Sequence, residues 1–146
     1  MEVKSEAKNL ESGRKVVNIT SLSHFEETVY RSEKPTIIDF WASWCMPCRM
    51  IGPIFEELAQ VYGEEMNFVK VNTQERADVA QLFGIRSIPT IVVMKGEEVK
   101  DVHIGAAPKN VIERLIRRAV DKEKKQGFTD RLKSIFGVQA VRSEVN

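Results

Sequence analysis

The feature that most limits how this chain folds is an apolar run at residues 36–42 that leads directly into a pair of cysteines. Apart from Asp39, the side chains on both alternating faces of the run are largely apolar, which is typical of a strand covered on both sides. Cys45 and Cys48 follow, and Pro47 between them suits the first turn of a helix. The run therefore predicts a buried strand that ends at a helix N-terminus carrying two thiols.

Strands and helices alternate on both sides of this run. Strands are expected at 15–19, 66–72, 90–94 and 98–104, and helices after Thr20 or Ser21, from 46 to about 62, from about 77 to 83, and from Pro108. Only three residues separate the last two strands, so these two form an antiparallel hairpin. This order predicts an α/β fold with a central mixed five-stranded sheet and helices on both faces.

The two ends of the chain differ from this central unit. Residues 1–14 are polar and are interpreted as a mobile or loosely docked arm, so the domain itself is expected at 15–120. Beyond it, Asp121 to Lys125 continue the last helix, and Gly127 is a stop signal. Residues 121–146 are therefore interpreted as a charged, amphipathic C-terminal helical extension.

Four apolar residues of the extension share one helical face: Phe128, Leu132, Ile135 and Phe136. Three roles for this face compete. Folding back onto the domain is the first expectation, and dimerisation through the extension is the second. Binding to a partner or a membrane surface is the third, because the net charge of +2 over residues 121–133 is weak for membrane attachment.

The overall charge and the end sequences exclude several partners. The formal net charge is +1, from 22 Lys and Arg against 21 Asp and Glu, so no overall field recruits nucleic acid. No apolar run is long enough to cross a membrane, and the N-terminus shows no secretory core. We therefore expect a cytoplasmic monomer with neither a nucleic-acid nor a membrane partner. In that compartment a C-x-x-C pair is expected to be catalytic rather than a lasting disulfide.

Cys45 and Cys48 are the only cysteines in the chain. A thiolate is the reactive form, and the unpaired N–H groups and positive dipole end of a helix start favour it at Cys45. Cys48 lies one turn further along and is expected to be shielded. The alternatives are two core cysteines or half of a zinc site, but zinc needs four ligands and only His24 and His103 remain. We therefore expect no metal.

The stretch from Trp41 to Met50 resembles the active-site signature of the thioredoxin family. Asp39, Pro53 and the run 84–90 lie at the family's spacing, and Ile104-Gly105-Ala106 matches its glycine turn. The likeness spans roughly residues 16–120. It implies the thioredoxin fold and a protein disulfide reductase without a bound cofactor. It also implies disulfide-containing protein substrates and a separate thioredoxin reductase that recharges the pair.

The resemblance also implies roles for four catalytic residues. Cys45 attacks a substrate disulfide, and Cys48 resolves the resulting mixed disulfide. Asp39, whose pKa burial should raise, helps to deprotonate Cys48. Lys70 in the neighbouring strand matches the family's partner lysine of Asp39. A purely structural Asp39–Lys70 ion pair is the alternative.

Six residues are implied to contact substrate: Trp44, Met46, Pro47, Ile88, Pro89 and Gly105. Pro89 is expected to be cis and to leave the preceding backbone free to pair with a bound peptide. Trp41 and Pro53 are given structural roles, and Pro53 should bend the helix that contains it. Met46 and Ser87 replace glycines that are usual in the family, so the redox potential and the substrate range stay open.

Two other functions compete with reduction. The first is disulfide oxidation or isomerisation by a more oxidising pair, which the absence of a signal sequence disfavours. The second is a non-catalytic thioredoxin-like binding module. Such modules tend to lose a cysteine or the proline, whereas Cys45, Cys48 and Pro89 are all present here.

Overall fold

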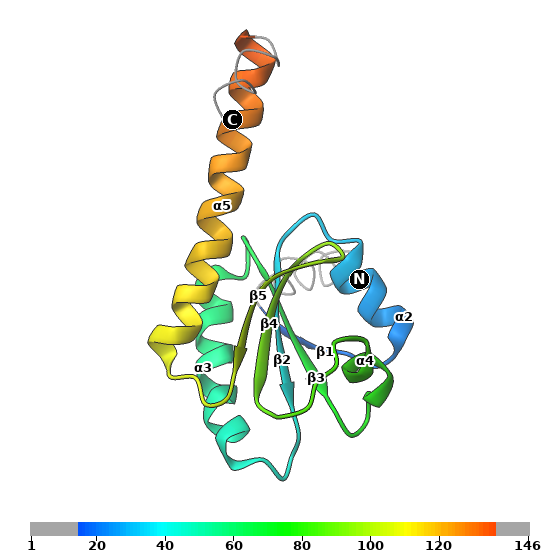
Figure 1. The fold of residues 1–146 in the computed structure, drawn as a ribbon. Coiled ribbons are helices and arrows are strands. Elements are labelled where there is room, and N and C mark those ends of the chain that lie inside the picture. Colours follow the sequence, from blue (N-terminus) through cyan, green and yellow to red (C-terminus); the bar gives the residue numbers. More distant parts are fainter. Residues whose placement is uncertain (1–14, 137–146) are drawn as a thin grey trace, which may run out of the picture.

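A single mixed sheet of five strands lies at the centre of the domain (Figure 1). The computed structural model describes residues 15–136. The strand order is β1 (Val16–Asn18), β3 (Asn67–Asn72), β2 (Thr36–Trp41), β4 (Thr90–Lys95) and β5 (Glu98–Ile104). The first three run parallel, while β4 is antiparallel to both β2 and β5. The predicted central sheet and terminal hairpin are confirmed.

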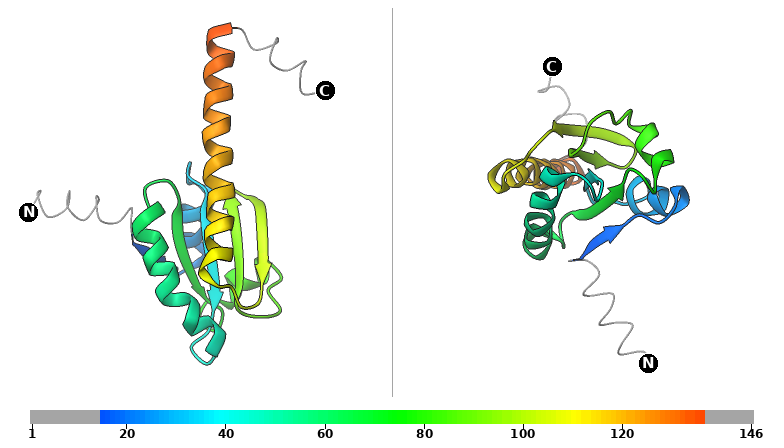
Figure 2. Two further views of the ribbon diagram at one scale, coloured as in Figure 1. Left: turned by 90° about the vertical axis from the view of Figure 1, so that its left-hand side faces the viewer. Right: turned by 90° about the horizontal axis from the view of Figure 1, so that it is seen from below.

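Helices cover both faces of the sheet, as Figure 2 shows from two sides. One face packs against α3 (Met46–Tyr62) and the first half of α5 (Lys109–Phe136). The other face packs against α2 (Leu22–Phe25), the π-helical turn η1 (Glu26–Tyr30) and α4 (Ala77–Leu82). The sheet therefore separates two apolar cores, as expected for a strand that is apolar on both sides.

Strand β2 contributes to both cores in alternation. Ile37 packs in the core under α3 and α5, whereas Ile38 and Phe40 pack in the core under α2 and α4. Because successive side chains of a strand point to opposite faces, Asp39 lies on the same face as Ile37, toward α3. The alternation places a carboxyl group in the layer that also contains the helix of the two cysteines.

Most predicted boundaries agree with the structure to within one or two residues. Ser21 caps α2 by accepting a hydrogen bond from the backbone N–H of His24 at 3.0 Å. The helix then widens to a π-helical turn, which the spacing did not predict. Gly84 ends the segment after α4 in the left-handed region, with φ of +60°. A residue without Cβ adopts this conformation at little cost.

The prediction that Gly127 stops the last helix is wrong. Helix α5 crosses residue 120 and Gly127 without a break and continues to Phe136 (Figure 1). A glycine within a helix costs only about 1 kcal/mol, and the charged residues before it are good helix formers. The expectation that the extension folds back onto the domain is also wrong, since Phe128 is 60% exposed and Phe136 70%. Residues 1–14 and 137–146 lie outside the described residues, and so does the arm placed at the N-terminus.

Candidate active site

The two cysteines begin helix α3, directly after the loop that leaves β2. Cys45 is the N-cap residue, and its Sγ accepts the backbone N–H of Cys48 at 3.3 Å. Pro47 lies in the first turn of the helix, where backbone N–H groups have no partner within the helix, so the absence of an N–H in proline costs nothing there. The two sulfur atoms form a disulfide across Cα atoms 5.3 Å apart. The helix N-terminus thus directs an N–H group at Cys45, an arrangement that favours a thiolate there.

Both cysteines of the disulfide are almost completely buried. Cys45 and Cys48 are 4% and 3% exposed, so Cys48 is shielded as expected and Cys45 shows little more of its surface. Around them Trp44, Met46 and Met50 are all largely exposed. These side chains give the start of α3 and the residue before it an exposed apolar surface.

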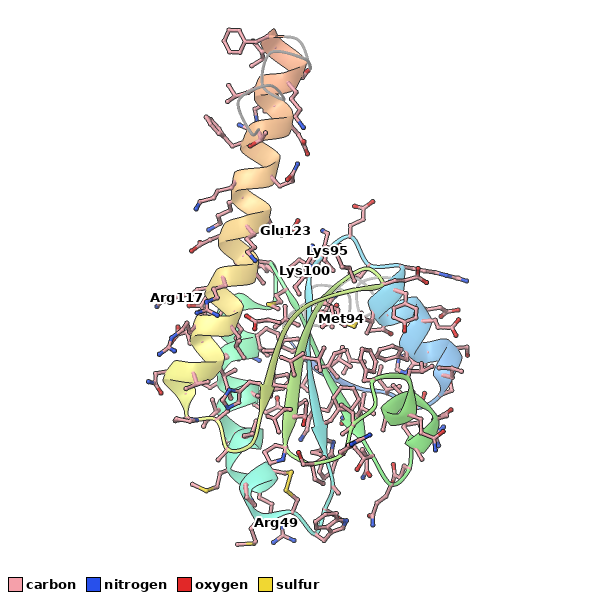
Figure 3. All side chains as sticks on the ribbon, viewed as in Figure 1. Arg49, Met94, Lys95, Lys100, Arg117 and Glu123 are labelled. Carbon is pink, nitrogen blue, oxygen red and sulfur yellow. A yellow bond between two sulfur atoms is a disulfide. The ribbon has the colours of Figure 1, made fainter. Side chains whose placement is uncertain are left out.

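The sequence analysis did not include Arg49 in the site. Its Nε and one terminal nitrogen donate to the carbonyl oxygen of Ser43 at 3.2 and 3.0 Å, and the other terminal nitrogen lies 4.0 Å from the Met46 sulfur. Arg49 therefore holds the loop before Cys45 against the first turn of α3, at the lower end of the domain in Figure 3. No sequence signal marks this role, because an arginine shows its two bonds to one carbonyl oxygen only in the folded chain.

Asp39 is completely buried beneath this end of α3. Neither of its carboxylate oxygens has a hydrogen-bond partner within residues 15–136. Burial raises the pKa of Asp39 from 3.8 to about 7, although the ammonium group of Lys70 opposes the shift. An unpartnered carboxyl group that gains and loses its proton near neutral pH is suited to acid–base work.

Lys70 pairs with Asp39 in the parallel register of β2 and β3, and the two side chains share one face of the sheet. The Lys70 Nζ lies 4.5 Å from the ring centroid of Trp41, and a Cβ added at Gly52 in α3 would lie 4.0 Å from the same atom. No salt bridge joins the Asp39 and Lys70 side chains, because neither carboxylate oxygen has a partner in the described part of the chain. The ammonium group instead packs between Trp41 and α3 and acts on Asp39 through space.

The opposite side of the site is built from two segments distant in sequence. The Ile88–Pro89 peptide bond is cis, as expected. Gly105 has φ of +100°, and its N–H donates to the carbonyl oxygen of Pro89 at 2.8 Å. The Thr90 hydroxyl donates to the carbonyl oxygen of Ser87 at 2.7 Å. These bonds fix the turn after β5 against the loop before β4.

A shallow cleft of about 370 Å³ connects Trp44 to this loop. Its other lining residues are Thr73, Ile85, Arg86, Ser87 and Ile88. Both the N–H and the hydroxyl group of Thr73 donate to the carbonyl oxygen of Trp41, at 2.9 and 3.3 Å. The structure thus brings Trp44 and Ile88 together across one cleft. Pro53, in contrast, lies inside α3 with an exposed side chain.

Two kinds of site are not found in the part of the chain that the structure describes. Within it, no group of three or more His, Cys, Asp and Glu residues is placed to hold a metal ion. None of the helices described combines the length and the apolar character that crossing a membrane requires.

Comparison with known proteins identifies the family. The thioredoxin family profile matches residues 16–118. Thioredoxin 1 of Nostoc sp. is 44% identical over 96 residues, which cover 66% of this chain and 90% of that protein. A chloroplastic relative, thioredoxin M4 of Arabidopsis thaliana, is 44% identical over the same length, although the matched part is 50% of that protein.

Solved structures agree with the family match. The crystal structure of Malassezia sympodialis thioredoxin superimposes with a TM-score of 0.68 at 36% identity, over 73% of this chain and 91% of that one. Plasmodium falciparum thioredoxin gives a TM-score of 0.65 at 33% identity, over 70% and 97% of the two chains. The matching family range ends before the second half of α5. The chain belongs to the thioredoxin family and is a thiol–disulfide oxidoreductase, a protein disulfide reductase whose redox group is its own C-x-x-C pair.

Proposed function

We propose that Cys45 is the attacking and Cys48 the resolving cysteine of this reductase. The Cys45 thiolate attacks one sulfur of a substrate disulfide, the substrate S–S bond breaks, and a mixed disulfide forms with loss of one substrate thiolate. Cys48 then loses its proton and attacks Cys45, which releases the second substrate thiolate and closes the Cys45–Cys48 bond. Two electrons pass from the dithiol to the substrate. The observation that supports this order is the N–H of Cys48 directed at the Cys45 sulfur.

Asp39 is the proposed acceptor of the Cys48 proton. It is buried on the α3 side of β2, and a pKa of about 7 leaves a substantial fraction ionised at neutral pH. Lys70 is a positioning residue in this scheme, because its charge acts on the Asp39 pKa rather than on the sulfur atoms. Trp41 holds Lys70 in place through its ring.

The proposed substrate is an extended polypeptide segment that carries a disulfide. Trp44 and Met46 would contact its apolar side chains, and Pro47 and Gly105 leave its backbone room at the two sides of the sulfur atoms. The backbone of Ile88 would pair with the segment as an added strand, because Pro89 has no N–H to compete for that position. The cleft between Trp44 and Ile88 supports this placement.

The test is reduction of insulin disulfides by the recharged protein. Cys45→Ser should abolish turnover, and Cys48→Ser should form a stable mixed disulfide with the substrate, visible as a reducible adduct by mass spectrometry. Val61→Ser, which changes a largely exposed residue at the opposite end of the same helix, is the matched control and should retain activity. The two roles would be reversed if the Cys45→Ser variant formed an adduct on Cys48 and the Cys48→Ser variant formed none on Cys45.

The same assay separates the competing functions. A wild-type protein that binds polypeptides without reducing them would be a binding module. A Cys45–Cys48 potential more oxidising than that of the glutathione pool, measured by equilibration with glutathione, would point to an oxidase or isomerase. We propose the reductase because all three hallmark residues, Cys45, Cys48 and Pro89, are in place.

The proposed setting is a reducing cytoplasm, with a thioredoxin reductase as electron donor and disulfide-containing proteins as acceptors. A C-x-x-C pair that must be recharged as a dithiol is suited to such a compartment. The redox state of the pair in intact cells, trapped by alkylation, tests the setting. A pair found mainly oxidised in growing cells would contradict it.

A further inference from the structure

Helix α5 carries two apolar stripes on opposite sides. The first half packs against the domain through Ile112, Leu115, Ile116, Ala119 and Val120. At 100° per residue, the stripe of Phe128, Leu132, Ile135 and Phe136 lies roughly half a turn around the helix from the first. Because the helix continues unbroken through Gly127, the second stripe faces away from its own domain. This phase difference explains the exposure of 60% at Phe128 and 66% at Ile135.

The charges of the second half are sorted around this stripe. On the helical wheel, Lys124 and Arg131 border the stripe on one side, and Lys122 and Lys133 lie beyond its other edge. Lys125 lies at the angle of the stripe itself, one turn before Phe128. Of the three acidic residues, Asp121 lies at the angle of the stripe but two turns before its first residue, Phe128, and so outside it. The other two lie on the far side of the helix and have partners there. Glu123 contacts Lys95 of β4 at 2.9 Å, and Asp130 accepts a hydrogen bond from Gln126 at 3.0 Å.

We propose that residues 124–136 bind the surface of a bilayer that contains anionic lipid. An apolar sector with cations on both flanks and acids opposite is the pattern of a helix that lies in the headgroup region. The apolar side chains enter the lipid, and the flanking lysine and arginine side chains reach the phosphates on either side. The net charge of +2 concealed this pattern, because it counts Asp121, which precedes the stripe, and Glu123 and Asp130, which face away from it.

Two other ways of covering the stripe fit less well. The stripe spans nine residues from Phe128 to Phe136, or about 12 Å of helix, too short to bury the roughly 800 Å² per chain of a stable dimer. Pairing with a second copy would also bring the flanking cations of both chains together. The domain itself is excluded as a partner by the half-turn between the stripes.

Attachment through the extension would leave the redox pair accessible. Arg49, next to Cys48, lies at the end of the domain opposite to the extension in Figure 3, and α5 leads away from the other end. A helix resting on lipid would therefore present the cysteines to proteins at the membrane surface. This inference does not depend on the roles proposed for the site residues.

The experiment is co-sedimentation of the full chain with vesicles in 0.05 M NaCl. One set of vesicles is pure phosphatidylcholine, and in the other roughly a third of the lipid is phosphatidylserine. We expect binding to the second set only, weakening at least roughly tenfold when NaCl is raised to about 0.5 M. Phe128→Ser/Phe136→Ser should weaken it at least roughly tenfold. The matched control, Val61→Ser/Leu82→Ser, changes exposed apolar residues of α3 and α4 and should bind like the wild type.

Charge is tested separately from the apolar stripe. Lys125→Gln/Arg131→Gln should weaken binding several-fold, whereas Arg31→Gln/Lys34→Gln removes the same charge from the loop between η1 and β2, outside the extension, and should not. Insulin reduction by all four variants should stay within about twofold of the wild type, because none of these residues touches the disulfide.

Several results would overturn the proposal. These are no sedimentation with phosphatidylserine vesicles, equal binding to both vesicle sets, or full binding by the double phenylalanine variant. A wild-type dimer that the same variant converts to a monomer in gel filtration would assign the stripe to a second copy. Tighter retention on immobilised polyglutamate than on the vesicles, lost in the same variant, would assign it to an acidic protein.

Discussion

The two ends of this molecule depart from the usual distribution of polar and apolar residues in opposite directions. At the active-site end, Asp39 is fully buried with neither oxygen hydrogen-bonded within residues 15–136. At the other end, Phe128, Ile135 and Phe136 are each at least 60% exposed on a helix that leaves the domain. Natural sequences follow the packing rules closely except at functional sites, where stability is sacrificed.

The two departures differ in what they cost. A buried carboxyl group lowers stability whenever it is ionised, and the fold has to compensate elsewhere. An exposed phenylalanine costs the folded state almost nothing, because it is equally exposed in the unfolded chain, but it favours association. The first departure should therefore be visible in stability and its pH dependence, and the second only in binding.

The largest expected effect is the pH dependence that Asp39 confers. Its pKa is 3.8 when unfolded and about 7 when folded, so between these values the folded protein holds a proton that the unfolded chain has lost. Stability therefore falls as the pH rises from about 4 to about 8, by up to about 4 kcal/mol. Urea unfolding of the oxidised protein at a series of pH values measures it. Asp39→Asn should remove this decline, whereas the control Asp130→Asn should leave it unchanged. A decline that persists in Asp39→Asn would show that another group causes the pH dependence.

The next effect compares the same residue type at the two ends. Phe55→Ala, in the fully buried core under α3, should lower the free energy of unfolding by about 3–4 kcal/mol. Phe136→Ala should change it by less than about 0.5 kcal/mol, because this side chain is 70% exposed. Thermal and urea unfolding measure both. A loss of stability in Phe136→Ala comparable to that in Phe55→Ala would show that the extension is packed in solution.

A smaller effect concerns the rate at the active-site end. Asp39→Asn should slow insulin reduction near pH 7 roughly tenfold or more, since it removes the proton acceptor proposed for Cys48. The same variant should be more stable than the wild type above pH 7, where Asp39 is ionised in the folded protein. Unchanged turnover together with lost stability would leave Asp39 only a structural role.

The smallest effect is that of Lys70. Its ammonium group lowers the pKa of Asp39, so Lys70→Met should raise that pKa further and move the midpoint of the pH–rate profile to higher pH. We expect a shift of up to about one pH unit, or about 1.4 kcal/mol. Lys100→Met on β5, far from Asp39 in the strand order, is the control. A profile that does not move in Lys70→Met would separate Lys70 from the titration.

Most of the residues proposed to be catalytic could be singled out from the sequence because their signals are local. The apolar strand, the two cysteines and Pro47 are adjacent in the chain, and their spacing alone predicts a helix N-terminus with a thiol on it. Asp39 was conspicuous as the one charge within an apolar strand. Arg49 escaped notice, because an exposed arginine has no distinguishing pattern until its bonds to the Ser43 carbonyl are seen.

The extension shows where local signals fail. Gly127 was interpreted as a stop because glycine often follows helix ends, but its cost within a helix is small compared with the tendency of its neighbours to stay helical. That single error reversed the interpretation of the stripe. With a break at Gly127 the stripe could turn toward the domain, whereas in a continuous helix it points away.

The sequence by itself determined the two-sided central strand, the C-x-x-C at a helix start, the hairpin and the apolar composition of both α5 stripes. Each of these depends on residues within a few positions of one another. The tertiary structure alone decided that Asp39 has no hydrogen-bond partner, that the N–H of Gly105 meets the Pro89 carbonyl, and that the two stripes face opposite ways. These features depend on packing and on the phase of a long helix, which distant parts of the chain set together.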